Sequence, residues 1–271
     1  MARTQTAWQW FRWWRQWRHL PVVERGGTFQ KLLRARRTTS LDWRLVRNSL
    51  PLPSTELIEM LDFGAASGEE GVTRRLSVGQ LEGTASTDRR KALWLAAFAE
   101  SVEPRSDKDR LILELGTCLG AGAVSLVLGA GGRCRYVGLE GSPELAALTG
   151  ERLNKTAPEA TVDLRVGPFR DTLPTLLAEQ PRFDLVFLDG HHDGRILLDQ
   201  WERLRTSIRP GGWMVVDDIR WSTDMQAAWN TLAHQPDVEA VDLFRMGALR
   251  KSGPGQPTSG GPRRIPSPLL A

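Results

Sequence analysis

The chain has 271 residues, of which 41% are hydrophobic and 25% are charged, as is ordinary for a globular protein with one substantial core. It contains no run of about 20 apolar residues that could span a membrane, and its start lacks the apolar core of a secretory signal. The two cysteines, Cys118 and Cys134, are too few for a disulfide framework or a structural zinc site. We therefore expect a cytoplasmic protein.

The formal net charge of +4 is distributed unevenly along the chain. Residues 1–50 contain eleven basic and two acidic side chains, or 11 − 2 = +9, so the remainder carries 4 − 9 = −5. We expect residues 1–50 to form a basic arm, rich in Trp and Arg. If any part of the protein meets a polyanion or an anionic lipid surface, it should be this arm.

The first twenty residues contain five of the eleven tryptophans. The apolar residues recur at the i, i+3, i+4 spacing of an amphipathic helix over residues 7–20. This stripe consists of Trp10, Trp13, Trp14, Trp17 and Leu20. Tryptophan beside arginine suits a lipid headgroup interface, which would place the protein at a membrane surface. The alternative interpretation is that the stripe packs on the protein's own body or on a second subunit.

Two further segments flank the expected main domain. Residues 51–110 contain short helical patterns and one clear helix at 88–102, so we expect a helical cap or lead-in. The tripeptide at 62–64, Asp-Phe-Gly, resembles a kinase magnesium motif, but the other kinase motifs do not precede it and that interpretation fails. Residues 251–271 are rich in Pro, Gly and Ser, which predicts a disordered tail.

Residues 111–250 alternate short apolar runs with helical patterns of ten to fifteen residues. Strands are expected at 111–115, 135–140, 161–166, 183–189, 213–218, 237–242 and 243–249. The alternation predicts an α/β fold with a doubly wound, Rossmann-like, seven-stranded and mostly parallel sheet whose final strand is antiparallel. Ligands of such sheets bind at the carboxyl ends of the strands.

The polar signals fall at these strand ends. The first strand runs into a turn that contains Gly116 and Gly120, which would let the backbone approach a ligand. The second strand ends in Glu140, about 20 residues later, where an acid can accept hydrogen bonds from both ribose hydroxyls. This pair indicates a nucleoside cofactor but does not by itself separate a dinucleotide from S-adenosylmethionine.

Several motifs in this region resemble those of one family. They are ELGTCLG (114–120), YVGLE (136–140), VGPF (166–169), FDLVFLDGHHD (183–193) and RPGGWMVVDDIRW (209–221). With them the sequence resembles the class I S-adenosylmethionine-dependent methyltransferases, and within these the small bacterial O-methyltransferases related to catechol and macrolide-sugar O-methyltransferases. A closer likeness over 57–248 is to a bacterial branch with DFGA (here 62–65) and DDI-x-W-S (here 217–222) segments.

The resemblance implies an S-adenosylmethionine site assembled from several strand ends. Glu140 would bind the ribose, and Glu114 would support the turn that lines the methionine end. The other implied cofactor residues are Gly116, Gly120, Gly167, Pro168, Phe169 and Asp189.

The resemblance also implies a Mg²⁺ site at Asp189, Asp217 and Asp218, since oxygen ligands suit this cation. The third member of the trio is usually asparagine in catechol-type enzymes, so Asp218 departs from the pattern. The alternative interpretation is that the adjacent acids only interact with the N-terminus of the following helix.

A proton acceptor is expected in the loop after Asp189. Methyl transfer is an in-line displacement in which the attacking hydroxyl must be aligned and deprotonated. His192 follows Asp189 by three residues, where catechol-type enzymes place a lysine, and a histidine suits the proton transfer. We predict catalytic roles for His192 and Asp189, and expect His191 to pack or to contact the cofactor.

The leading functional prediction is an S-adenosylmethionine-dependent O-methyltransferase acting on a small hydroxylated molecule. One alternative is a nucleic-acid ribose methyltransferase that holds phosphate with the +9 arm. A second is a non-catalytic scaffold whose arm docks on a membrane or partner, although the retained acids at the strand ends argue against decay of the site. The methyl acceptor and the oligomeric state have no readable signal in the sequence.

Overall fold

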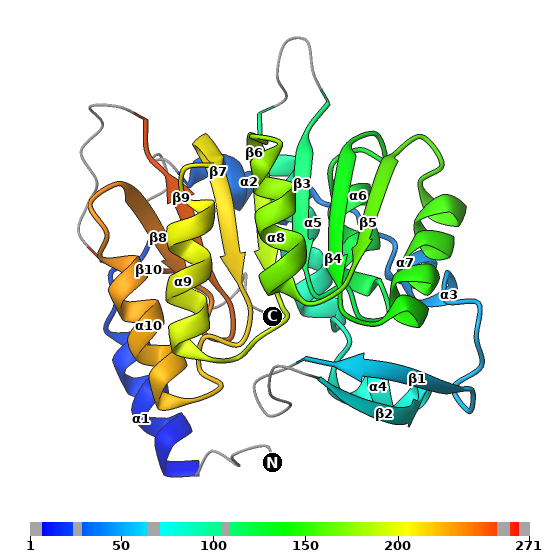
Figure 1. Ribbon diagram of the computed structural model, residues 1–271. Helices are drawn as coiled ribbons and strands as arrows, with labels where there is room; N and C mark the ends of the chain where they lie inside the picture. The colour runs from blue at the N-terminus through cyan, green and yellow to red at the C-terminus, as the bar shows by residue number, and fades with distance from the viewer. Residues whose placement is uncertain (1–6, 24–28, 64–70, 104–108, 254–260, 266–271) are drawn as a thin grey trace.

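The computed structural model describes residues 7–23, 29–63, 71–103, 109–253 and 261–265. Its centre is an eight-stranded sheet in the order β10-β8-β9-β7-β6-β3-β4-β5 (Figure 1). The strands are β3 (Leu111–Leu115), β4 (Arg135–Glu140), β5 (Thr161–Val166), β6 (Phe183–Leu188), β7 (Ile208–Val216), β8 (Val238–Asp242), β9 (Gly247–Lys251) and β10 (Arg263–Arg264). The five strands from β5 to β7 are parallel, and β9 runs antiparallel to β7 and β8. The predicted doubly wound sheet with an antiparallel last long strand is confirmed, and β10 is an added edge.

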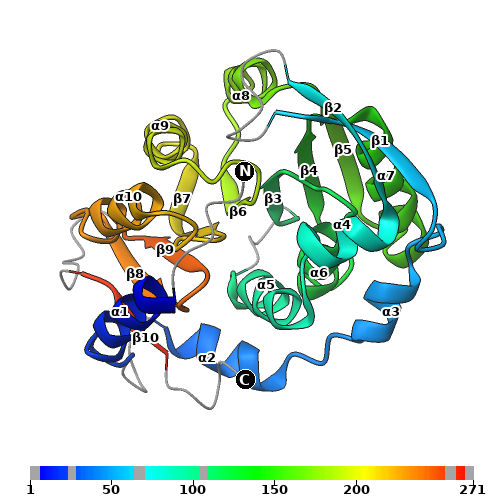
Figure 2. The same cartoon turned by 90° about the horizontal axis from the view of Figure 1, so that it is seen from below.

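Side chains alternate between the two faces of the sheet and bury a helical layer on each. On β3, Ile112 points into one core and Leu113 into the other. The first core is covered by α5 (Arg89–Ser101), α6 (Ala121–Gly129) and α7 (Pro143–Thr156), and the second by α8 (Phe169–Ala178), α9 (Gly194–Leu204) and α10 (Thr223–Ala233). Figure 2, seen along the sheet, shows these two layers on opposite sides. Two short helices, α2 (Gln30–Thr38) and α3 (Trp43–Asn48), extend the first layer.

The lead-in region differs from the helical expectation. It contains a two-stranded antiparallel hairpin, β1 (Leu57–Asp62) and β2 (Val72–Ser77), followed by α4 (Val78–Thr84) and α5. The hairpin forms because Ile58 is fully buried against α4 and α7, while a backbone hydrogen bond at 2.9 Å joins the N–H of Glu59 to the Glu144 carboxylate. The helix expected at 88–102 is present as α5.

The arm begins with α1 (Ala7–Arg18), the predicted amphipathic helix. Trp13 and Trp17 are buried, and the Trp17 indole donates a hydrogen bond of 3.0 Å to the carbonyl of Asp242 at the end of β8. The ring of Trp17 also lies edge-on to Phe244, at 5.8 Å. This part of the stripe packs on the protein's own body, as the alternative interpretation expected. No helix in the described part of the chain is long and apolar enough to cross a bilayer.

The predicted disordered tail is wrong for residues 261–265. Arg263 and Arg264 form β10, which pairs with β8, and Arg264 also exchanges backbone hydrogen bonds with the segment after α1, at 2.8 and 3.0 Å. The following Ile265 is fully buried. A composition rich in Pro, Gly and Ser does not reveal that Arg263 and Arg264 form an edge strand beside β8. Residues 254–260 and 266–271 lie outside the described residues.

Candidate active site

The loops after β3, β4, β6 and β7 meet at the carboxyl edge of the sheet, which is the lower edge in Figure 1. Gly116, directly after β3, has φ +88°, and a Cβ there would stand 2.7 Å from the carbonyl oxygen of Asp189. Glycine is therefore required where the first loop touches the loop after β6. This contact brings the predicted cofactor turn and the predicted catalytic loop together.

Glu140 ties the cofactor turn to the end of β4. Its Oε2 accepts hydrogen bonds from the backbone N–H groups of Thr117 and Cys118, both at 2.9 Å, and from the Thr117 hydroxyl at 3.2 Å. Its Oε1 accepts one bond, from the N–H of Ser142 at 3.0 Å. Burial raises the pKa of Glu140, and these hydrogen bonds oppose that rise. A carboxylate has about four acceptor positions, so with respect to the described residues Oε1 retains capacity for one further donor.

Glu114 lies under the same turn. It is buried, and the hydroxyl of Tyr136 on β4 donates a hydrogen bond to its Oε2. Burial raises the pKa of Glu114 to about 8, although the Tyr136 hydrogen bond opposes the rise, and the nearby charge of Glu140 raises it further. Glu114 is therefore a buried weak acid at the end of β3, and its support of the cofactor turn stays a prediction.

The segment after β5 lies beside these loops. The N–H of Gly167 donates a 2.9 Å hydrogen bond to the carbonyl of Glu140, and Pro168 precedes α8 as its N-cap. The ring of Phe169 packs against that of His191, with centroids 5.2 Å apart. The structure thus brings the predicted adenine-bordering residues to the same edge as Glu140.

The predicted acidic trio converges as well. Asp189 follows β6, and Asp217 and Asp218 follow β7. Burial, then the charge of Asp217, holds the pKa of Asp189 well above its usual range. Asp218 adopts φ +47°, a left-handed conformation that aspartate tolerates better than most residues.

The partner of this trio is a lysine that sequence reasoning missed. The ammonium of Lys91, in the first turn of α5, forms an ion pair with Asp217 and lies 3.9 Å from Asp218. Arg245, in the turn between β8 and β9, approaches Asp218 to 3.5 Å. Burial alone would lower the pKa of Lys91, but the charges of Asp217, Asp189 and Asp218 outweigh it and raise that pKa. Lys91 is therefore a fixed positive charge.

These residues do not fit the predicted Mg²⁺ ion. Within the described ranges, no three His, Cys, Asp or Glu side chains are arranged so that they could hold a metal ion. An ion bound by Asp217 and Asp218 would have to displace Lys91, whose ammonium already occupies the space between them. The sequence places the three acids at the correct strand ends. The positive charge that lies beside Asp217 and Asp218 is the ammonium of Lys91.

The two histidines of the loop face different surroundings. His192 lies near Asp218, and its ring is 5.0 Å from that of Trp221, whose side chain is 42% exposed. His191 packs on Phe169, and burial lowers its pKa, although the nearby backbone of Phe63 opposes that change. Of the two histidines, His192 is the one that borders the acidic trio, and the roles predicted for them stay predictions.

Phe63 is another site neighbour that the motifs did not assign. It follows β1, and its ring packs on Gly141, where a Cβ would stand 2.7 Å from the ring. Phe63 therefore covers the end of β4 directly beside Glu140. It belongs to the DFGA segment 62–65, of which residues 64 and 65 lie outside the described residues.

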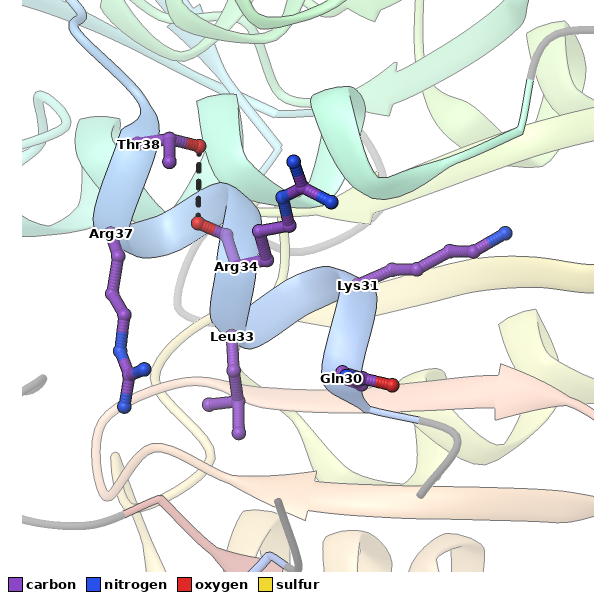
Figure 3. Close-up of a pocket in the computed structure, with 6 residues that line it drawn as sticks. All are labelled: Gln30, Lys31, Leu33, Arg34, Arg37 and Thr38. Atoms are coloured by element: carbon purple, nitrogen blue, oxygen red, sulfur yellow. Dashed lines mark hydrogen bonds between the residues drawn. The ribbon is translucent and has the colours of Figure 1, made fainter. Parts of the chain in front are cut away.

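A hollow on α2 is separate from this site. It is lined by Gln30, Lys31, Leu33, Arg34, Arg37 and Thr38 (Figure 3). All six come from one surface helix, and none is a predicted site residue. One of its basic side chains, Lys31, is ion-paired with Glu103.

Parts of the chain are similar in sequence to known methyltransferases. Residues 113–219 match a family model described as a methyltransferase domain. The chain is 35% identical over 146 residues to a catechol O-methyltransferase of Mycobacterium tuberculosis, which covers 54% of this chain and 62% of that protein. It is 32% identical over 109 residues to a catechol O-methyltransferase of Niastella koreensis, covering 40% and 48%.

Solved structures share the fold. The O-methyltransferase of Bacillus cereus in complex with SAH superposes with a TM-score of 0.55 at 18% identity, over 81% of this chain and 96% of that one. The predicted fold is thereby confirmed, and the resemblance to a methyltransferase domain is confirmed for residues 113–219. The chain spans less than two thirds of the length of the curated relatives that it matches.

Proposed function

We propose that this chain, which carries a methyltransferase domain over residues 113–219 on a class I methyltransferase fold, methylates a hydroxyl group of a small molecule with S-adenosylmethionine. The observation that carries the proposal is the meeting of two loops at one sheet edge. The loop held by Glu140 contacts, through Gly116, the loop that begins with Asp189. Cofactor residues and a candidate proton acceptor therefore lie within one site.

In this proposal the cofactor lies over the Gly116–Gly120 turn. Glu140 has its remaining acceptor position on Oε1 for a ribose hydroxyl, and Glu114 supports the turn from below. The adenine is bordered by Gly167, Pro168 and Phe169. When bound, S-adenosylmethionine supplies a methyl group on a positively charged sulfur.

The methyl acceptor lies between Asp189, His192 and Trp221. His192 takes the proton of the attacking hydroxyl, and the half-exposed Trp221 ring beside it offers a flat apolar surface to an aromatic acceptor. Catechol, the substrate in the names of the two relatives, is an aromatic molecule with adjacent hydroxyls. We therefore favour small aromatic hydroxyl compounds as acceptors.

The two alternative functions have weaker support. The matched relatives are named for a small molecule, which does not favour ribose methylation of nucleic acid. The site also combines a shaped cofactor turn with buried acids, which a non-catalytic scaffold would not need.

The basic arm suggests a partner outside the site. On the face of α1 that points away from the body, Trp8, Phe11 and Trp14 are 68%, 53% and 40% exposed. Three arginines of the same helix, Arg12, Arg15 and Arg18, are exposed as well. We propose that this face, defined by these six residues, rests on an anionic lipid surface as a peripheral contact.

The test is incubation of the protein with isotopically labelled S-adenosylmethionine and a panel of aromatic hydroxyl compounds, followed by mass spectrometry. The expected result is a labelled methyl ether from at least one compound and at least a tenfold slower reaction for His192→Ala. His234→Ala, in an exposed histidine of the α10 C-cap, is the matched control. Tight cofactor binding with no labelled product from the panel or from a cell extract would contradict the proposal.

A further inference from the structure

We propose that the ammonium of Lys91 takes the place of a divalent cation in this site, so that the enzyme works without a metal. The inference rests on the proposed methyl transfer, but its first test does not need turnover. It starts from the position of Lys91 Nζ, which is paired with Asp217 and lies 3.9 Å from Asp218 with only 13% of the side chain exposed.

The fold holds Lys91 in this position. Asp88 caps α5, and its Oδ1 accepts hydrogen bonds from the N–H groups of Arg90 at 2.8 Å and Lys91 at 2.9 Å. The first helical turn is therefore fixed by a cap and by the buried ion pair at the other end of the Lys91 side chain. The helix cap fixes the backbone of Lys91 and the ion pair fixes its ammonium. The position of this ammonium is therefore determined by the fold.

Two cations of the chain face the acids of the site. Lys91 and Arg245 bring two positive charges to Asp217 and Asp218. A divalent cation bound by Asp217 and Asp218 would lie beside the Lys91 ammonium, which repels it.

An ammonium can supply the electrostatic part of the chemistry. It has three N–H donors, of which one faces Asp217 and a second points toward Asp218. The third can donate to the acceptor oxygen and stabilise the negative charge that develops on it. Lys91 would thus be a catalytic residue that lowers the pKa of the acceptor hydroxyl, as a bound metal does elsewhere.

The proposed step is balanced without any further reactant. The O–H bond of the acceptor breaks and its proton goes to a ring nitrogen of His192. The acceptor oxygen forms a bond to the methyl carbon while the bond from that carbon to sulfur breaks, and the electron pair stays on sulfur. The products are a methyl ether, S-adenosylhomocysteine and protonated His192, and Lys91 keeps its proton throughout.

The first test is Mn²⁺ binding to the full chain, measured by electron paramagnetic resonance. Wild type and the control Arg90→Met, which removes an exposed charge from the same helical turn, should bind no Mn²⁺ at the site at millimolar ion. Lys91→Met, which empties the space between the acids, should gain at least tenfold affinity, and the further change Asp217→Asn should abolish it. Calorimetric binding of S-adenosylhomocysteine verifies that each variant is folded.

The second test uses turnover where an acceptor has been found. Wild type should keep its rate in excess chelator, and Lys91→Met should lose about 100-fold under the same conditions, the usual effect of removing a donor to a developing oxyanion. Stoichiometric Mn²⁺ binding by wild type, or a wild-type rate that falls with chelator and returns with Mg²⁺, would overturn the proposal. Failure to find any acceptor would instead count against the proposed function, because the Mn²⁺ result is independent of turnover.

Discussion

Glu140 holds the turn after β3 through backbone hydrogen bonds, and in the proposed function the same carboxylate also accepts a hydrogen bond from the ribose. Glu140→Gln keeps the shape but replaces one oxygen by an amide that cannot accept. We expect S-adenosylhomocysteine to bind about 1.5–3 kcal/mol more weakly, the range for hydrogen bonds to charged groups. Calorimetry checks this, with Glu151→Gln on the exposed face of α7 as control. Equal affinities for both variants would remove Glu140 from the binding site.

Glu114 makes stability depend on pH in a predictable direction. Its pKa is about 8 in the folded protein, against 4.5 for an unperturbed glutamate. Between these values the folded state binds more protons than the unfolded state, so the free energy of unfolding falls as pH rises, by up to about 1.4 kcal/mol per pH unit. The substitution Glu114→Gln should remove this fall in the free energy of unfolding with pH, because glutamine does not titrate.

The measurement is urea unfolding of wild type and Glu114→Gln at pH 5 and pH 8.5. The free energy of unfolding of the variant, minus that of wild type, should be larger at pH 8.5. Since other groups titrate equally in both proteins, the difference isolates Glu114. A difference that stays constant or shrinks with pH would show that Glu114 is ionised in the folded protein at low pH.

The site residues that could be predicted are those at strand ends. Parallel strands bring their carboxyl ends to one edge, so Glu140, Asp189 and Asp217 were located from chain order alone. Lys91 and Asp217 are 126 positions apart, and nothing in a helical pattern says which side chain of its first turn points toward the sheet. Mg²⁺ was implied by the resemblance to catechol-type enzymes, which gives no indication that Lys91 lies beside the acids.

Among the elements, one part of the α1 stripe packs on the protein's own body and another part is exposed, so each of the two interpretations of the stripe fits a part of it. The period of its apolar residues predicted a helix, and a period cannot say which partner covers each part of a wide stripe. Trp13 and Trp17 are buried, whereas Trp14 is exposed with the guanidinium of Arg18 over its ring, 4.6 Å from the centroid. The hairpin β1–β2 was missed for a related reason, because glycines between its strands resemble helix breaks and the strands pair across them.

The exposed face of α1 can be tested without disturbing its buried face. In the triple variant Trp8→Ser, Phe11→Ser and Trp14→Ser, binding to vesicles with 30% anionic lipid should fall at least tenfold, since the indoles no longer bury apolar area. The arginines, each contributing about 1 kcal/mol at such a surface, should leave a weak binding that salt abolishes.

Sedimentation of the protein with vesicles measures this binding, and circular dichroism verifies that the thermal midpoint is unchanged. Neutral vesicles and the variant Leu57→Ser, an exposed apolar residue of the hairpin, serve as controls. Wild type that stays in the supernatant with anionic vesicles would end the membrane proposal.

Across the whole molecule, segments outside residues 113–219 complete the candidate site. Lys91 comes from the lead-in helix, Phe63 from the hairpin and Arg245 from the β8–β9 turn. Helix α1 contacts the β8–β9 turn, because Trp10 and Trp17 pack on Phe244. Phe244 has a strained φ of +72°. The arm is thus connected to the acidic trio through Phe244 and Arg245.

This connection predicts a separation of effects when residues 1–20 are deleted. The deletion exposes Phe244 and removes the Trp17 hydrogen bond to the end of β8, so the thermal midpoint should fall by several degrees, as loss of about 1 kcal/mol or more requires in a chain of this size. Cofactor affinity should change less than threefold, because Glu140 lies on β4, beyond β9, β7, β6 and β3 in the sheet order. Calorimetry with S-adenosylhomocysteine at low temperature measures it. If affinity falls as far as in Glu140→Gln while the protein remains folded, the arm acts on the cofactor half of the site, and α1 cannot be treated as a support of the β8–β9 turn alone.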